Sequence, residues 1–179
     1  MNLKKLLLCS FWFVFFEGVS ANESKDGLCE PDEIMVASCR LDEKKNRILS
    51  FCASADSKTI FYRFGTGSTI ELMKNFSSEN PVFRWVDAAT YTTYFGFRSS
   101  GYAYVFGVPQ ETLGAKAFLE VTSLNRSVMS RTCTDNSFGR KSIISEAVRE
   151  IEDSVVRGAD FLFPPDNIML DENSKLKRE

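Results

Sequence analysis

The chain contains no histidine among its 179 residues. Histidine is the commonest general base and the usual activator of serine and cysteine nucleophiles, so its absence removes the Ser–His and Cys–His mechanisms. Zinc also loses its commonest nitrogen ligand, and the cysteines do not form C-x-x-C pairs. A P-loop and a G-x-S-x-G nucleophile elbow are absent as well. The sequence therefore predicts no catalytic residue, no cofactor and no metal site.

The chain also has little net charge and few long apolar runs. The formal net charge is −2, so the chain has no strong electrostatic field that would attract nucleic acid or an anionic membrane surface. Beyond residue 21 no apolar run approaches the ~18 residues of a membrane span. We therefore expect neither a nucleic-acid partner nor a transmembrane anchor. Hydrophobic residues still make up 44% of the chain, which is typical of a globular domain.

The N-terminus has the three parts of a Sec-type signal peptide, which we assign to residues 1–21. Met1–Lys5 is basic, Leu6–Phe16 is apolar, and Val19-Ser20-Ala21 matches a small-residue cleavage site. Cys9 does not indicate a lipid anchor, because it precedes most of the apolar run. Cleavage near Ala21 predicts a periplasmic or secreted protein.

Four cysteines follow the cleavage site: Cys29, Cys39, Cys52 and Cys133. An even number in an exported chain predicts two disulfides. Four cysteines allow three pairings, and the sequence alone does not choose among them. We favour Cys29–Cys39 with Cys52–Cys133, which combines a local bridge with a long-range one.

Residues 34–133 form a predicted disulfide-stapled β domain, which follows a polar leader at residues 22–33. Segments of alternating polarity are separated by turn residues about every ten positions. The predicted strands are Ile34–Leu41, Arg47–Ala53, Lys58–Phe64, Thr69–Met73, Val82–Val86, Thr90–Arg98, Tyr102–Val108, Ala115–Ser123 and Ser127–Cys133. This pattern predicts a mostly β fold, an antiparallel sandwich or flattened barrel of about eight short strands.

The clearest hairpin spans Lys58–Met73, with Gly65-Thr66-Gly67 expected to supply positive φ at its turn. Tyr62 and Phe64 face one way, and Arg63 faces the other. In one interpretation Arg63 pairs on the surface with Glu71 across the hairpin. In the other, partner contact is made by a loop of Arg63, Gly65, Thr66, Gly67 and Ser68.

An aromatic stripe follows this hairpin, and its members are Tyr91, Phe95, Phe97, Tyr102, Tyr104 and Phe106. Most of it is expected in the core, and exposed members would offer a protein or glycan contact surface. Beyond the β domain, residues 134–163 are predicted to be a helical segment, with an amphipathic helix over Ser142–Val156 that packs on the β domain. Residues 164–179 are expected to form a flexible charged tail.

Several motifs together resemble an uncharacterised family of small exported bacterial proteins with a C…SC, LSxCA and YRFG…xEL layout. They are Cys29–Cys39, Ile48–Ala53, Ile60–Gly65, Ile70-Glu71-Leu72, Gly101–Tyr104 and Cys133. The resemblance covers roughly Cys29–Cys133 and implies a periplasmic β domain of a Gram-negative bacterium. It carries over no catalytic residue.

Three functions remain open. The first is a periplasmic binding module, such as an inhibitor or immunity protein against a cell-envelope hydrolase, whose partner would be a cell-envelope protein. The second is an envelope-maintenance protein that binds glycan or lipid. The third is a hydrolase that uses paired carboxylates, with candidate acids Glu71, Asp87, Glu111 and Glu120.

Overall fold

The computed structural model describes residues 27–124 and 126–166, which form two sheets and one short helix. The elements are β1 (Ile34–Arg40), β2 (Ile48–Ala53), β3 (Ile60–Thr66), β4 (Thr69–Phe76), β5 (Val82–Val86), β6 (Thr93–Ser99), β7 (Tyr102–Val108), β8 (Phe118–Ser123), β9 (Arg126–Thr132), β10 (Val148–Ile151) and α1 (Asp153–Gly158). The predicted mostly β, sandwich-like fold is confirmed, with a four-stranded and a six-stranded sheet and no closed barrel.

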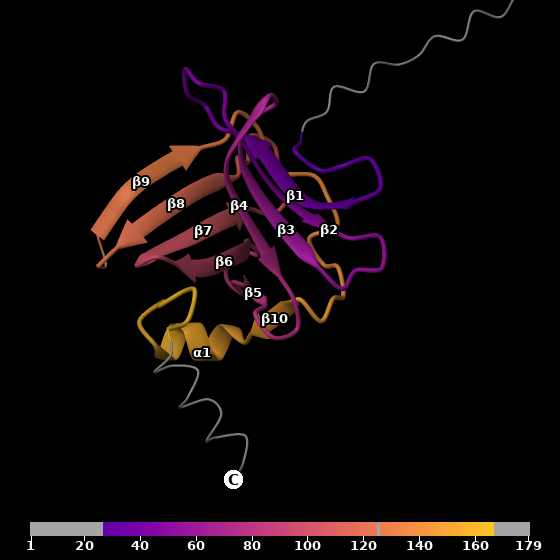
Figure 1. Cartoon of the computed structure of the whole chain (residues 1–179). Helices are drawn as coiled ribbons and strands as arrows, with labels where there is room; N and C mark the ends of the chain where they lie inside the picture. The colour runs from indigo at the N-terminus through magenta and orange to yellow at the C-terminus, as the bar shows by residue number, and fades with distance from the viewer. Residues whose placement is uncertain (1–26, 125, 167–179) are drawn as a thin grey trace, which may run out of the picture.

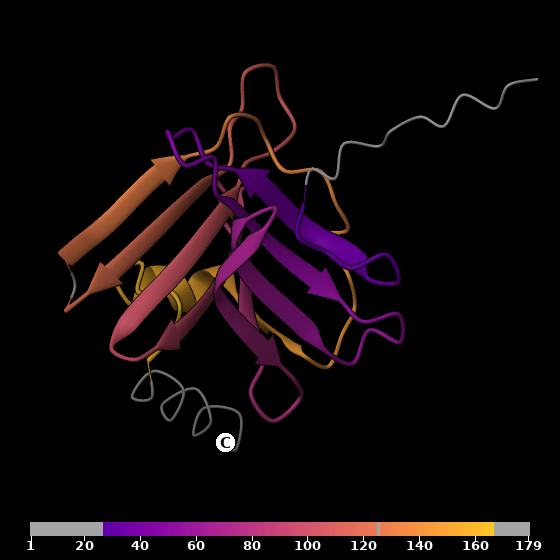
Figure 2. The same cartoon turned by 45° about the horizontal axis from the view of Figure 1, so that its top comes forward.

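The four-stranded sheet has the order β1-β2-β3-β4, and the six-stranded sheet has the order β10-β5-β6-β7-β8-β9. All neighbours pair antiparallel except β10 and β5, which are parallel. The sheets are joined where β9 ends beside the loop between β1 and β2 (Figure 2). There Leu41 forms a bridge with Cys133, and the Asp42 N–H donates to the Thr132 carbonyl at 2.9 Å.

Aromatic side chains fill the space between the sheets. The ring of Phe51 on β2 lies 5.4 Å from Phe95 on β6 and 6.3 Å from Phe106 on β7, measured between centroids. Phe95, Phe97 and Phe106 are buried, as predicted for the aromatic stripe. Tyr91 and Tyr102 of that stripe are 62% and 41% exposed. Burial of these rings accounts for much of the driving force for folding.

A second, smaller apolar cluster lies on the other face of the six-stranded sheet, which α1 covers (Figure 1). Trp85 of β5 packs there with Val156 of α1 and with Phe163. The indole N–H of Trp85 donates to Asp153 at 2.9 Å, which fixes the start of the helix against the sheet. A helix this short is not stable by itself, so packing and this hydrogen bond stabilise it.

The predicted helix over Ser142–Val156 is wrong for most of its length. Residues Val148–Ile151 form β10, and the helix comprises only Asp153–Gly158. The edge of β5 offers backbone groups that β10 can pair with. The first of these hydrogen bonds runs from the Val82 N–H to the Ala147 carbonyl, at 3.0 Å. This non-local pairing outweighs the helical spacing of the apolar residues, because local propensity is weak compared with tertiary contacts.

Some predicted segments lie outside the described residues: the signal peptide (1–21), the start of the leader (22–26) and most of the charged tail (167–179). Pro164 and Pro165, which lie in the segment predicted to be a flexible tail, are buried. The Pro164 carbonyl accepts a hydrogen bond from Arg98 at 3.0 Å. Within residues 27–124 and 126–166, no helix is long and apolar enough to cross a membrane.

Candidate functional site

Two disulfides are present, but their pairing differs from the predicted one. Cys29 bonds Cys52, and Cys39 bonds Cys133. The pairing follows from topology, since the chain after β9 returns beside the end of β1 and leaves the Cα atoms of Cys39 and Cys133 5.9 Å apart. Disulfides persist in oxidising compartments, so the two bonds indicate a protein outside the cytoplasm.

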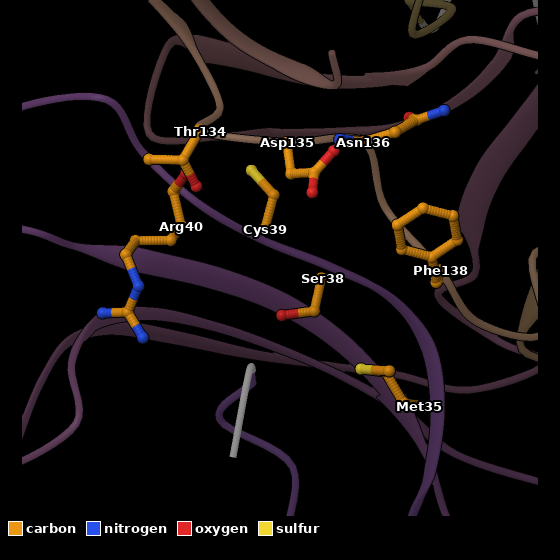
Figure 3. Close-up of a pocket in the computed structure, with 8 residues that line it drawn as sticks. All are labelled: Met35, Ser38, Cys39, Arg40, Thr134, Asp135, Asn136 and Phe138. Atoms are coloured by element: carbon orange, nitrogen blue, oxygen red, sulfur yellow. Dashed lines mark hydrogen bonds between the residues drawn. The ribbon is translucent and has the colours of Figure 1, made fainter. Parts of the chain in front are cut away.

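A first hollow lies beside β1, next to the Cys39–Cys133 bond (Figure 3). Its volume is about 300 Å³, and the residues around it are Met35, Ser38, Cys39, Arg40, Thr134, Asp135, Asn136 and Phe138. The Arg40 guanidinium and the Asp135 carboxylate point apart, and neither side chain forms an ion pair with another described residue. None of the residues predicted for partner contact lies here.

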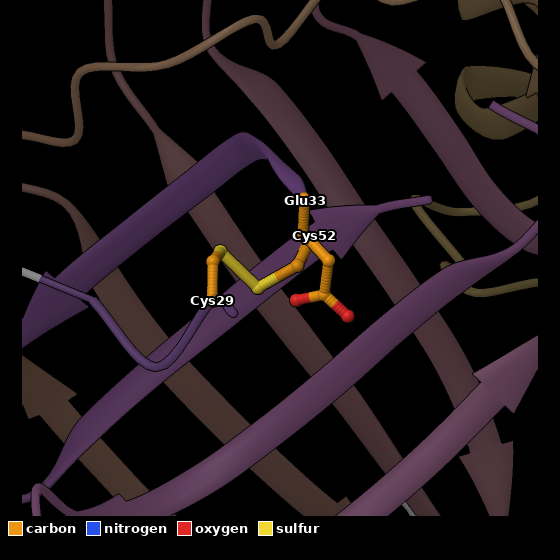
Figure 4. A group of neighbouring side chains, drawn as sticks. All are labelled: Cys29, Glu33 and Cys52. Carbon is orange, nitrogen blue, oxygen red and sulfur yellow. A yellow bond between two sulfur atoms is a disulfide. The ribbon is translucent and has the colours of Figure 1, made fainter. Parts of the chain in front are cut away.

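The strap, defined as residues 27–33, crosses the outer face of the four-stranded sheet. The Cys29–Cys52 bond ties it to β2 (Figure 4). The Leu28 N–H donates to the Ser50 hydroxyl at 2.9 Å, and the Leu28 carbonyl accepts from Arg63 at 3.3 Å. The strap is therefore fixed to both β2 and β3.

Arg63 holds the strap through a buried ion pair. Its side chain alternates with those of Tyr62 and Phe64 in the core, so it lies on the outer face. Its guanidinium donates to both carboxylate oxygens of Glu33, at 2.6 and 2.8 Å. The two side chains are only 10% and 7% exposed. Burial raises the pKa of Glu33, but hydrogen bonds from Arg63 and the Glu30 backbone and the Arg63 charge outweigh this and leave it below its usual value.

The predicted surface pair of Arg63 with Glu71 is wrong. The β3–β4 register places Met73 opposite Arg63. Glu71 instead accepts a hydrogen bond from Arg47 at 3.3 Å. Sequence reasoning missed Glu33 because the strap has no strand or helix pattern that would place it over β3.

Cys29, Glu33 and Cys52 offer potential metal-ligand atoms within 4.8 Å of one another (Figure 4). Both sulfur atoms are bonded to each other, and a disulfide lacks the thiolate charge that metals bind. The Glu33 carboxylate is engaged by Arg63. In this oxidised form the group is a structural clamp rather than a metal centre.

The tip of the β3–β4 hairpin differs from the predicted turn. Thr66 pairs with Thr69, so the turn consists of Gly67 and Ser68, and Gly67 does not have a positive φ. Gly65 lies within β3 at a φ of 159°, close to extended backbone. A Cβ at Gly65 would lie 2.1 Å from the Thr69 carbonyl oxygen, so this glycine permits a close backbone approach.

That close approach occurs at a β-bulge, where the register shifts between Phe64 and Gly65. Leu72 pairs with Phe64 and Ile70 pairs with Gly65, which leaves Glu71 as the extra residue. A bulge moves the following side chains to the other face. Strict alternation would place Ile70 on the same face as Leu72. Because of the bulge, Ile70 instead lies on the outer face, as Met73 does.

The contact groove is the space between the strap and this hairpin, and its volume is about 430 Å³. The residues around it are Gly27, Leu28, Cys29, Glu30, Ile48, Arg63, Gly67, Ser68, Thr69, Ile70 and Met73. Three of the predicted contact residues, Arg63, Gly67 and Ser68, are among them, whereas Gly65 and Thr66 are not.

The apolar residues of the contact groove are the part that sequence reasoning missed. Ile70 and Met73 are 45% and 53% exposed on a strand at the edge of its sheet. Leu28 and Ile48 complete an apolar lining beside the Arg63–Glu33 pair. Exposed apolar side chains gathered around a concavity are typical of a binding surface.

The four candidate acids are divided among separate environments. Glu71 pairs with Arg47, Asp87 with Arg157, and Glu111 with Lys141. Glu120 lies on β8, in the six-stranded sheet, and no ion pair joins it to another described residue. The pKa of Asp87 lies below its usual range because the Ala89 N–H and the Thr90 hydroxyl donate to it, and Arg157 adds to the effect.

Comparisons with known proteins give no match: no protein-family model, no curated protein and no solved structure resembles the chain closely enough to count.

Proposed function

We propose that the protein is a binding module that acts in the periplasm or after secretion, as an inhibitor or immunity protein against a cell-envelope hydrolase. The observation that carries the proposal is the contact groove, where exposed Ile70 and Met73 stand beside a clamped strap. The N-terminal signal pattern and the resemblance to exported bacterial proteins support the compartment.

The rigidity of the contact groove favours tight binding. One wall is the strap, tied by the Cys29–Cys52 bond and by the Arg63–Glu33 pair. The other wall is the β3–β4 hairpin, with Gly65 packed against the backbone of Thr69. A wall that is already ordered loses little conformational entropy on binding, which raises affinity for a given contact area.

The chemistry of the acids favours binding over hydrolysis. A paired-carboxylate hydrolase needs a general acid with a raised pKa close to a second carboxylate. The pKa of Asp87 is lowered, and Glu71 and Glu111 each pair with a different cation. These acids are therefore better explained as ion-pair partners.

A second candidate function, glycan binding in envelope maintenance, is favoured by one observation. The rings of Phe97 and Tyr104 stack at 4.8 Å, and Tyr102 continues the row 6.4 Å further on. Tyr102 is 41% exposed at the end of this row. An exposed tyrosine offers a flat apolar face and a hydroxyl, which suits a sugar ring.

Affinity capture from an envelope extract, read by mass spectrometry, tests the proposal. The bait is the oxidised protein, and the parallel arm measures its binding to isolated cell wall. A single envelope hydrolase captured in stoichiometric amount, and inhibited by added protein, is the expected result. Binding to cell wall without any protein partner would overturn the inhibitor proposal in favour of the glycan-binding one.

A further inference from the structure

The rim of the contact groove carries uncompensated negative charge. Arg63 at the groove is neutralised by its two-point pair with Glu33. Glu30 borders the groove, and both Glu30 and Asp32, which is two residues further along the strap, are exposed. No ion pair joins Glu30 or Asp32 to another residue in the described part of the chain. Among the described residues, the groove therefore presents a negative edge and no cation without an ion-pair partner.

The opposite side of the groove carries two exposed apolar side chains beside the polar Ser68 and Thr69. Ile70 and Met73 project from β4 and keep about half of their surface exposed, at 45% and 53%. Exposure of such side chains to water is unfavourable, and a partner that covers them removes this penalty. A partner that fits both sides needs an apolar group for Ile70 and Met73 and a cation for Glu30 and Asp32.

We propose that the contact groove receives a loop of the partner protein that carries a bulky aliphatic or aromatic side chain next to a lysine or arginine. The apolar side chain packs on Leu28, Ile70 and Met73, and the cation faces Glu30 and Asp32. Charge complementarity of this kind speeds association and is weakened by salt. This inference rests on the proposed binding function and names the chemistry of its partner.

A random peptide library displayed on phage tests the inference while the partner itself is unidentified. The oxidised protein is the bait, and one selected peptide is then synthesised for affinity measurements. We expect the selected peptides to combine an aliphatic or aromatic residue with an adjacent lysine or arginine. Selection of acidic peptides, of peptides without this combination, or of none would overturn the inference.

Matched variants locate the binding site of the selected peptide. Met73→Glu should weaken binding at least about tenfold, as expected for a central apolar contact. Val128→Glu is the control, because Val128 is similarly exposed, at 55%, but lies on β9 of the other sheet. Both variants should keep the thermal midpoint of the wild type, since neither side chain is buried. Equal binding by Met73→Glu and wild type would overturn the inference.

Charge reversal tests the cationic half of the inference. Glu30→Lys should weaken binding of the peptide about threefold and should reduce its dependence on salt. Glu79→Lys is the control, because Glu79 is exposed in the loop between β4 and β5, away from the groove. Unchanged affinity and unchanged salt dependence in Glu30→Lys would overturn the inference.

The two proposals can fail separately. If an envelope hydrolase is captured equally by wild type and by Met73→Glu, the contact groove is not the binding site, but the proposed binding function stands. If neither protein captures a hydrolase, the proposed function itself is wrong.

Discussion

The Arg63 guanidinium and the Glu33 carboxylate share two hydrogen bonds, at 2.6 and 2.8 Å, and so join β3 to the strap. The pair lies beside the Cys29–Cys52 bond, which fixes the same strap to β2. One wall of the contact groove therefore depends on a covalent and an ionic link. Neither Arg63 nor Glu33 is free to serve as a simple surface contact.

Removing either partner of this pair should destabilise the protein. Arg63→Met leaves the Glu33 carboxylate nearly buried without a cation, which costs about 3 kcal/mol. Combining Arg63→Met with Glu33→Gln should cost less than the sum of the two single changes, because no unpaired charge then remains. Urea unfolding of the three variants measures this coupling. Additive losses would show that the pair does not act as a unit.

Stability should fall in acid, partly through Glu33. The folded pKa of Glu33 lies below its ordinary value of 4.5, so the folded protein favours the ionised carboxylate. Its contribution is complete above that value and is lost as the pH falls through the folded pKa. Unfolding free energies measured from neutral pH down to about pH 3 should drop less steeply in Glu33→Gln than in wild type. A parallel pH dependence of the two proteins would contradict the assignment.

The two disulfides should contribute unequally. Cys39–Cys133 closes a separation of 94 residues and Cys29–Cys52 one of 23. Chain-entropy arguments give about 4.7 and about 3.4 kcal/mol for loops of these lengths. The double Cys→Ser variant that lacks Cys39–Cys133 should therefore unfold at a lower denaturant concentration than the one that lacks Cys29–Cys52. Peptide mapping without reduction checks the pairing first, and recovery of a Cys29–Cys39 peptide would contradict the structure.

Two glycines at the hairpin tip form a matched pair for substitution. Gly65→Ala brings a methyl group against the Thr69 carbonyl and should cost about 1–3 kcal/mol. At Gly67 an added Cβ would meet no atom within 4 Å beyond Gly67 itself and its two chain neighbours, so Gly67→Ala should be nearly neutral. Thermal unfolding distinguishes the two. Equal stability of both variants would show that the bulge tolerates a side chain at Gly65.

Local patterns predicted the strands well. The predicted bounds of β5 and β7, Val82–Val86 and Tyr102–Val108, match the structure. Alternating polarity and nearby turn residues are local features of the sequence. They therefore indicate these strands without knowledge of contacts elsewhere in the fold.

Features that depend on distant contacts were not predictable in this way. β10 forms because β5 lies beside it, although its own sequence has helical spacing. The partner of Arg63 is Glu33, which is 30 residues earlier in the chain. The bulge near Gly65 turns Ile70 to the outer face of β4, whereas strict alternation of side chains would place it on the inner face with Leu72. Non-local pairing and one extra residue in a strand leave little signal in a single sequence.

The glycan alternative makes its own prediction. Tyr102→Ala removes the exposed end of the aromatic row and should reduce binding to isolated cell wall if that function holds. It should leave capture of a protein partner unchanged, because Tyr102 lies on the six-stranded sheet and outside the contact groove. Quantitative pull-down with cell wall and with extract measures both effects on one variant.

The most direct test of the central claim compares capture from envelope extract by wild type, Met73→Glu and Val128→Glu, all oxidised and confirmed folded. The account predicts one envelope hydrolase bound by wild type and by Val128→Glu, and lost in Met73→Glu. Equal recovery with all three proteins would contradict the groove as the binding site, and recovery of no hydrolase with any of them would contradict the proposed function.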